Sequence, residues 1–158
     1  MSKVLRRSSG VAHALGVALL PLLAACFGAA SAEYLPLDDC PVTTPTGGAP
    51  PSQQPAASYH HEGEFWVSLT TSGVFNVDGP EDGAKVIWWR PTDATDLEIT
   101  GRRLDGPSEP LVADILSGYA YRLQATGLEF AEPGCWEVTA QSAGHELTFV
   151  TRVAFEDR

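Results

Sequence analysis

The stretch CWEVTAQSAGHELTFVTRVAF, residues 135–155, decides the fold of this chain. Its first part alternates, with Trp136 and Val138 on one side, and its second part alternates again from Leu147 onward. Residues 142–145, Ser-Ala-Gly-His, separate the two parts as a short loop. Because successive side chains of a strand point to opposite faces, this pattern predicts a β-hairpin with one buried face.

Five more short runs rich in β-branched and aromatic residues precede the hairpin, at 65–70, 74–77, 85–90, 96–104 and 119–125. The run 85–90 is continuous rather than alternating, which is typical of a strand covered on both faces. Residues 111–116 are the one candidate for a helical turn. About seven short strands without an amphipathic helix predict an all-β fold, an immunoglobulin-like antiparallel β-sandwich over residues 59–158.

The N-terminal residues 1–25 have the layout of a bacterial signal peptide. Basic residues at positions 3, 6 and 7 precede an apolar run over residues 11–23. This run is shorter than a comfortable membrane span, and a histidine and a proline interrupt it. We therefore expect this segment to direct export rather than to remain as a transmembrane helix.

Two cleavage sites follow the apolar run. Leu-Ala-Ala-Cys at 23–26 fits a bacterial lipobox at every position, which predicts cleavage before Cys26 and lipidation of that residue. Ala-Ser-Ala at 30–32 also suits ordinary signal cleavage, after Ala32. The first site predicts a lipid-anchored protein of the cell envelope, and the alternative predicts a soluble secreted protein.

Residues 26–58 are expected to form a tether followed by a proline-rich extended segment. Between residues 40 and 58 prolines recur, and neither a helix nor a strand period is visible. This part is therefore predicted to be extended or disordered. If Cys40 is disulfide-bonded, the segment is pinned at one end and drapes over the domain.

The chain is acidic, with 20 Asp and Glu against 10 Lys and Arg and a formal net charge of −10. Export would remove three basic residues and no acidic ones, which leaves 7 − 20 = −13. A domain with this charge repels nucleic acid and anionic lipid headgroups. Neither is expected as a direct partner.

The chain has 3 cysteines, at positions 26, 40 and 135. If Cys26 is lipidated or cleaved away, Cys40 and Cys135 remain in an oxidising compartment, where a disulfide between them is expected. Such a bond closes a loop of roughly 95 residues and stabilises the fold by about 4 kcal/mol as an upper estimate. The alternative is a pair of free buried thiols.

The cluster Tyr-His-His-Glu at 59–62 is the first candidate for a metal site, since imidazole is a common ligand of Zn²⁺ and Cu²⁺. In an extended chain, however, the side chains of His60 and His61 point to opposite sides. Further ligands would have to come from elsewhere, with His145 as one candidate. We expect a solvated segment here, and no metal or other cofactor.

Trp66, Trp88 and Trp89 are the candidate ligand surface, because aromatic rings on a β-sandwich can stack sugar rings. The alternative is core packing. Trp88 and Trp89 are adjacent, so one ring must face each side of their strand. We expect one of the two in the core and the other beneath the proline-rich segment.

Three arginines, Arg90, Arg102 and Arg103, stand among many acidic residues and are expected to be salt-bridge partners rather than an anion site. Exposed pairs of this kind contribute about 0–1 kcal/mol each.

Four sequence pieces resemble a group of secreted bacterial proteins with no assigned activity. They are CPVT at 40–43, WWR at 88–90, GRRLDGP at 101–107 and GCWEVT at 134–139. The resemblance covers about residues 38–155. It implies a single exported β domain, a bonded Cys40–Cys135 pair and a location outside the cytoplasm. It supplies no catalytic or binding residues.

No motif carries recognisable catalytic chemistry: a Gly-x-Ser-x-Gly elbow, a Cys–His pair and a phosphate-binding loop are all missing from the sequence. We expect a non-enzymatic extracytoplasmic protein, a tethered interaction or structural module of the cell envelope. Its partners would be the membrane, through the lipid on Cys26, and an unknown protein or cell-wall glycan. The alternatives are a carbohydrate- or cell-wall-binding module that uses an exposed Trp, and a small metal-binding envelope protein.

Overall fold

The computed structural model describes residues 34–51, 58–92, 96–119 and 122–156. The predicted signal peptide 1–25, Cys26 and Ala32 lie outside the described residues. The described part forms one short 3-10 turn, η1, and nine strands, which confirms the all-β prediction. Their bounds are η1 (Leu37–Asp39), β1 (Tyr59–Glu62), β2 (Phe65–Ser68), β3 (Val74–Val77), β4 (Ala84–Trp89), β5 (Glu98–Arg103), β6 (Val112–Ile115), β7 (Leu123–Glu129), β8 (Gly134–Ser142) and β9 (His145–Phe155).

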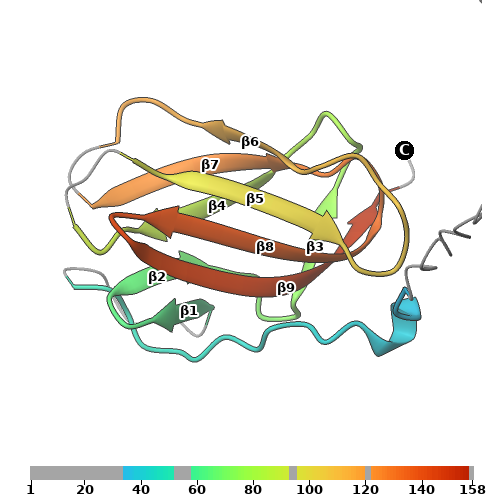
Figure 1. Ribbon diagram of the computed structural model, residues 1–158, viewed down its shortest axis with the longest axis horizontal. Coiled ribbons are helices and arrows are strands. Elements are labelled where there is room, and N and C mark those ends of the chain that lie inside the picture. The colour runs from blue at the N-terminus through green and yellow to red at the C-terminus, as the bar shows by residue number, and fades with distance from the viewer. Residues whose placement is uncertain (1–33, 52–57, 93–95, 120–121, 157–158) are drawn as a thin grey trace, which may run out of the picture. The chain divides into compact units, whose positions relative to one another are not determined.

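The strands form two sheets (Figure 1), with the orders β1-β2-β4-β7-β6 and β3-β9-β8-β5. The predicted hairpin is the pair β8–β9, which runs in register from Gly134 opposite Val153 to Ser142 opposite His145. One pair differs from the antiparallel prediction, because β3 runs parallel to β9. Strand β2 belongs to the five-stranded sheet and β3 to the four-stranded sheet, so the chain crosses between the sheets before β3 pairs with β9.

The core lies between the two sheets and contains large aromatic side chains. Trp88 on β4 and Trp136 on β8 are both 0% exposed, and Phe65 and Phe149 pack beside Trp88 with ring centroids 6.0 Å away. The indole Nε1 of Trp88 donates to Thr126 Oγ1 at 2.9 Å, so this buried polar group is satisfied. As the alternation in residues 135–155 predicted, the side chains of Trp136, Val138, Leu147 and Phe149 lie in this core.

Two strands were not predicted. Residues 112–115 form β6, which pairs with β7, so the expected helical turn at 111–116 is wrong. Residues 59–62 form β1, which pairs with β2 around a turn at Gly63. The segment that was expected only to lead into the first strand is therefore itself a strand, and its side chains are partly or fully exposed. Both are four-residue strands whose sequence signal is weak, and pairing with a longer neighbour decides their conformation.

Residues 34–51, which we call the strap, follow one side of the sandwich in an extended conformation. The strap donates main-chain hydrogen bonds from Leu35 to Leu104 O at 2.9 Å and from Thr43 to Val150 O at 2.8 Å. Figure 1 shows it running beside β9 toward β1 and β2. The packed domain therefore begins well before residue 59.

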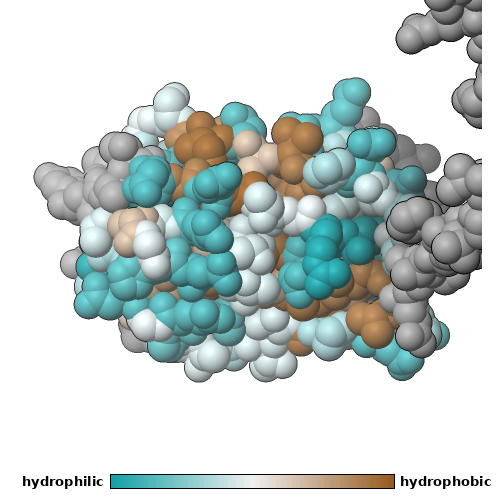
Figure 2. Space-filling model, in the orientation of Figure 1, coloured by the Kyte–Doolittle hydropathy of each residue, from teal (hydrophilic) through white to brown (hydrophobic). Residues whose placement is uncertain are grey.

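The outer face of β5, β8 and β9 is largely hydrophilic, as Figure 2 shows, and brown patches are confined mainly to the margins of this view. Threonines follow one another across this face, and the hydroxyls of Thr139 and Thr148 lie 2.9 Å apart. None of the helical segments in the described part of the chain has the length and apolar character needed to cross a membrane.

Candidate functional site

Trp66 and Trp89 lie directly opposite each other on β2 and β4, on the outer face of the five-stranded sheet. Their neighbours Phe65 and Trp88 point the other way and are fully buried. Alternation along each strand therefore directs the first two tryptophans away from the core and the third into it. Trp88 cannot contribute to a ligand surface, whereas Trp66 and Trp89 form a partly buried aromatic pair.

His61 on β1 completes this aromatic cluster. It lies opposite Trp66 in the strand register, and the two rings stack with centroids 4.0 Å apart and planes inclined by 20°. Tyr59 meets the same indole edge-on at 6.4 Å. On the strap, a Cβ added to Gly48 would lie 3.4 Å from the Trp66 ring. The strap thus packs against Trp66, whereas we expected it to cover one of the adjacent pair Trp88 and Trp89.

Arg122 covers the other tryptophan. Its Cζ lies 5.6 Å from the ring centroid of Trp89, within cation–π range. The guanidinium is held in place by Glu64 Oε2 at 3.1 Å and by the carbonyl of Arg90. The indole Nε1 of Trp89 is buried and has no hydrogen-bond partner. This end of the surface therefore carries an ion pair beside an aromatic ring, while the indole N–H of Trp89 lies beneath the surface.

His60 does not join His61. It lies opposite Val67 in the register and so points inward, toward the space between β1 and β9. Burial lowers its pKa below the ordinary value, while the charge of Glu62 and the backbone of Thr148 oppose this effect. Its Nδ1 is buried without a partner. Within the described ranges no three His, Cys, Asp or Glu side chains gather as a metal-binding group.

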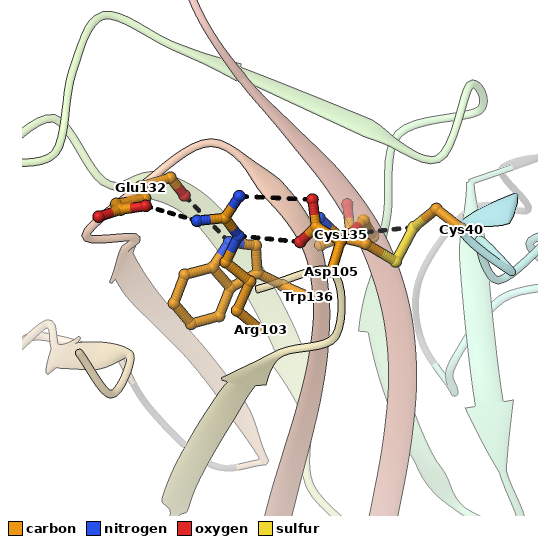
Figure 3. Close-up of polar contacts among 7 residues, drawn as sticks. Cys40, Arg103, Asp105, Glu132, Cys135 and Trp136 are labelled. Carbon is orange, nitrogen blue, oxygen red and sulfur yellow. Dashed lines mark hydrogen bonds and ion pairs between the residues drawn. A yellow bond between two sulfur atoms is a disulfide. The ribbon is translucent and has the colours of Figure 1, made fainter. Parts of the chain in front are cut away.

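A second polar cluster occupies the end of β5, where the sequence suggested only ordinary salt bridges. The Arg103 side chain is 18% exposed and that of Asp105 only 5%, and Nε of the arginine lies 2.8 Å from Asp105 Oδ1. Figure 3 shows the guanidinium between Asp105 and Glu132, beside the ring of Trp136. By contrast, Arg102 is 69% exposed and pairs with Glu137 as expected.

Hydrogen bonds stabilise the charged forms of Asp105 and Arg103. Burial alone would raise the pKa of Asp105, but bonds from Arg103 and from the Cys135 N–H outweigh it and hold the pKa below its ordinary value. The hydrogen bond to Asp105 raises the pKa of Arg103. Gly134 is required here, because its φ is +147° and an added Cβ would lie 2.5 Å from Arg103 Nε.

The disulfide between Cys40 and Cys135 lies next to this cluster (Figure 3), on the side of β8 opposite Trp136. It joins the strap to the four-stranded sheet across 95 residues of sequence. The three sequence pieces 40–43, 101–107 and 134–139 therefore meet at one corner of the fold. Their contacts are structural.

A shallow hollow of about 400 Å³ beside the β8–β9 hairpin contains none of the tryptophans. Asp96, Glu98 and Glu146 contribute acidic groups to its lining. The carboxylate of Asp96 already accepts a hydrogen bond from the Ala143 N–H.

Comparisons of the chain with protein-family models, with curated proteins and with solved structures gave no match. That Trp66 and Trp89 lie opposite each other could not be predicted from sequence, because β3 separates β2 from β4 along the chain. The charged turn GRRLDGP was the sequence signal for the Arg103–Asp105 cluster. The other members, Glu132 and Cys135, lie about thirty residues later in the chain, so the turn alone did not reveal their contacts.

Proposed function

We propose that this chain is a non-enzymatic module of the bacterial cell envelope, exported and then tethered to the membrane by a lipid on Cys26. Its described part is a sandwich that presents surfaces for contact with other molecules. The ion pairs of Arg103 with Asp105 and of Arg122 with Glu64 have their charges compensated within the protein.

The disulfide is the observation that carries the proposal. Disulfides persist in oxidising compartments and are rare in the reducing cytosol. Here the bond between Cys40 and Cys135 fastens the strap, which directly follows the predicted tether, to the sandwich. An export signal with a lipobox and a disulfide immediately downstream support the same location.

We also infer that the sandwich is immunoglobulin-like, and its strand order supports this. The order β2-β4-β7-β6 against β9-β8-β5 corresponds to strands A-B-E-D and G-F-C of a constant-type immunoglobulin domain. Two features depart from that pattern. The disulfide joins the strap to β8 rather than the two sheets, and a core tryptophan, Trp88, lies on the strand equivalent to B. Immunoglobulin-like domains commonly serve as interaction modules at cell surfaces.

Fractionation of cells that express the full chain tests the tether. We expect the unmodified protein in the membrane fraction and Cys26→Ser in the soluble extracytoplasmic fraction. Ala32→Leu is the matched control, because it blocks only the alternative cleavage site and should leave the protein with the membrane. Identical partitioning of the unmodified protein and Cys26→Ser would contradict the lipid anchor.

A second candidate function is glycan binding, which the outward pair Trp66–Trp89 favours. The partly exposed ring of Trp89, with Arg122 and Glu64 beside it, offers aromatic contact and hydrogen bonding to a sugar. We expect purified peptidoglycan to retain the protein and Trp89→Ala to reduce that retention. Tyr34→Ala, which removes an exposed aromatic ring on the strap, should leave it unchanged. If peptidoglycan does not retain the unmodified protein, this result would contradict glycan binding.

A further inference from the structure

The way the strap joins the sandwich limits how a tethered domain can sit on a membrane. We propose that the η1 end of the sandwich faces the bilayer and that the β8–β9 hairpin faces away from it. This inference rests on the lipid tether of the proposed function and adds an orientation to it.

The strap is fastened at its N-terminal end. The Leu35 N–H is bonded to Leu104 O, and Cys40 follows five residues later with its disulfide to Cys135. Cys135 lies opposite Arg152, near the end of β9. Leu37 and Phe155 border the same hollow, so η1 and the C-terminal end of β9 are close together. The chain therefore enters the sandwich at the end where β9 finishes.

The length of the tether, compared with the length of the sandwich, limits how the domain can be oriented on the membrane. From Cys26 to Leu35, the first fastened residue, the chain has nine residues, which span at most about 31 Å whatever their conformation. Strand β9 has 11 residues, from His145 at the hairpin to Phe155, and is about 33 Å long. A tether shorter than the sandwich cannot let the domain turn over and bring the hairpin to the bilayer.

The surface at the η1 end suits this position. Tyr34, Leu35 and Leu37 are 46%, 40% and 37% exposed, and they are three of the six exposed large hydrophobic residues in the described part of the chain. Apolar and tyrosine side chains are tolerated at the headgroup region of a bilayer. Asp38 and Asp39 lie among them, so an uncharged or zwitterionic headgroup surface fits better than an anionic one.

The strap is essential to this orientation. If it were released, the first fastened point after Cys26 would be Tyr59 on β1, and the tether would have 33 residues. Such a chain reaches roughly 115 Å when extended and would impose no orientation. The disulfide and the Leu35 bond thus determine which end of the sandwich is presented outward.

Energy transfer from the protein to the membrane tests the orientation. Single cysteines replace exposed residues at the two ends of β9, in Glu156→Cys and His145→Cys. In lipidated protein with the native disulfide, each new thiol is the only one free for a donor dye. The proteins are reconstituted in phosphatidylethanolamine and phosphatidylcholine vesicles that contain an acceptor lipid. We expect several-fold stronger transfer from position 156 than from position 145.

A lengthened tether is the matched control. Insertion of about 20 Gly and Ser residues between Glu33 and Tyr34 leaves the sandwich intact and should remove most of the difference between the two positions. Equal transfer from both positions with the native tether would overturn the orientation while leaving the lipid anchor standing. Transfer from neither position would instead show that the domain is not held at the bilayer, which would contradict the proposed tethered function.

Discussion

Asp105 shows how a single carboxylate organises one corner of the sandwich. Its oxygens accept hydrogen bonds from Arg103 and from the main chain of Cys135, so it links the end of β5 to the start of β8. The Arg102–Glu137 pair joins the same two strands but lies in solvent. The two adjacent arginines therefore allow a buried and an exposed ion pair to be compared in one protein.

We predict that Asp105→Asn lowers the free energy of unfolding by about 3 kcal/mol, because it leaves the buried arginine with only its exposed partner Glu132. The control Glu137→Gln, which removes the exposed pair, should change it by less than about 1 kcal/mol. Urea unfolding at neutral pH measures both. Equal effects of the two substitutions would show that burial of the Asp105 pair is unimportant.

The same carboxylate also predicts acid sensitivity. The folded-state pKa of Asp105 lies below its unfolded value, so its contribution is fully present above the unfolded value, about 4. It is lost as the pH falls through the lower, folded-state value. The difference in stability between the unmodified protein and Asp105→Asn should therefore shrink on acidification below about pH 4.

His60 predicts a second, milder dependence on pH. Burial lowers its folded-state pKa, so the unfolded chain takes up a proton first as the pH falls. Its contribution is complete above the unfolded value, about 6.5, and is lost between there and the lower folded-state value. Thermal unfolding between pH 7.5 and 5 should show this loss in the unmodified protein and in His61→Gln, but not in His60→Gln. The same loss in His60→Gln would contradict the inward position of this ring.

Among the elements, the strap depends most on long-range contacts. It has no regular secondary structure apart from η1, and its main-chain groups bond to β9, β1 and the turn after β5. It lies beside the part of β9 that β3 leaves unpaired, since β3 pairs only with residues 152–155. The strap thereby covers a sheet edge that would otherwise be open to another chain.

We predict that replacing both Cys40 and Cys135 with Ala lowers the free energy of unfolding by about 3 kcal/mol. The loss should be smaller than the chain-entropy value of about 4, because the released strap gains conformational freedom in the folded state as well. Hydrogen exchange should show that the Thr43 amide loses protection while the core amides of β8 keep theirs. Unchanged protection at Thr43 would mean that the disulfide does not hold the strap.

Strands that bury a regular face were predictable from sequence, because alternation is a local signal. Residues 135–155 alternate strongly and form β8 and β9 where expected. β1 and β6 were not predictable, because each has four residues and depends on a partner strand for its conformation. The pairing of Trp66 with Trp89 likewise needs the order of strands in the sheet, which is set by the packing of distant segments.

At the scale of the whole molecule, we propose that strong acidity and a short lipid tether would act together. The exported chain would carry a charge of about −13, which opposes adsorption to anionic surfaces. A lipid on Cys26 would hold the domain at the membrane in spite of this charge. The disulfide then fixes the point from which the sandwich projects.

Mass spectrometry of the protein isolated from its native cells is the most direct test of this account. We predict a chain that lacks residues 1–25, carries the added mass of acyl groups on Cys26, and yields a cross-linked peptide that contains Cys40 and Cys135. A full-length chain with Cys40 and Cys135 both free to react with an alkylating agent would contradict export and the disulfide together.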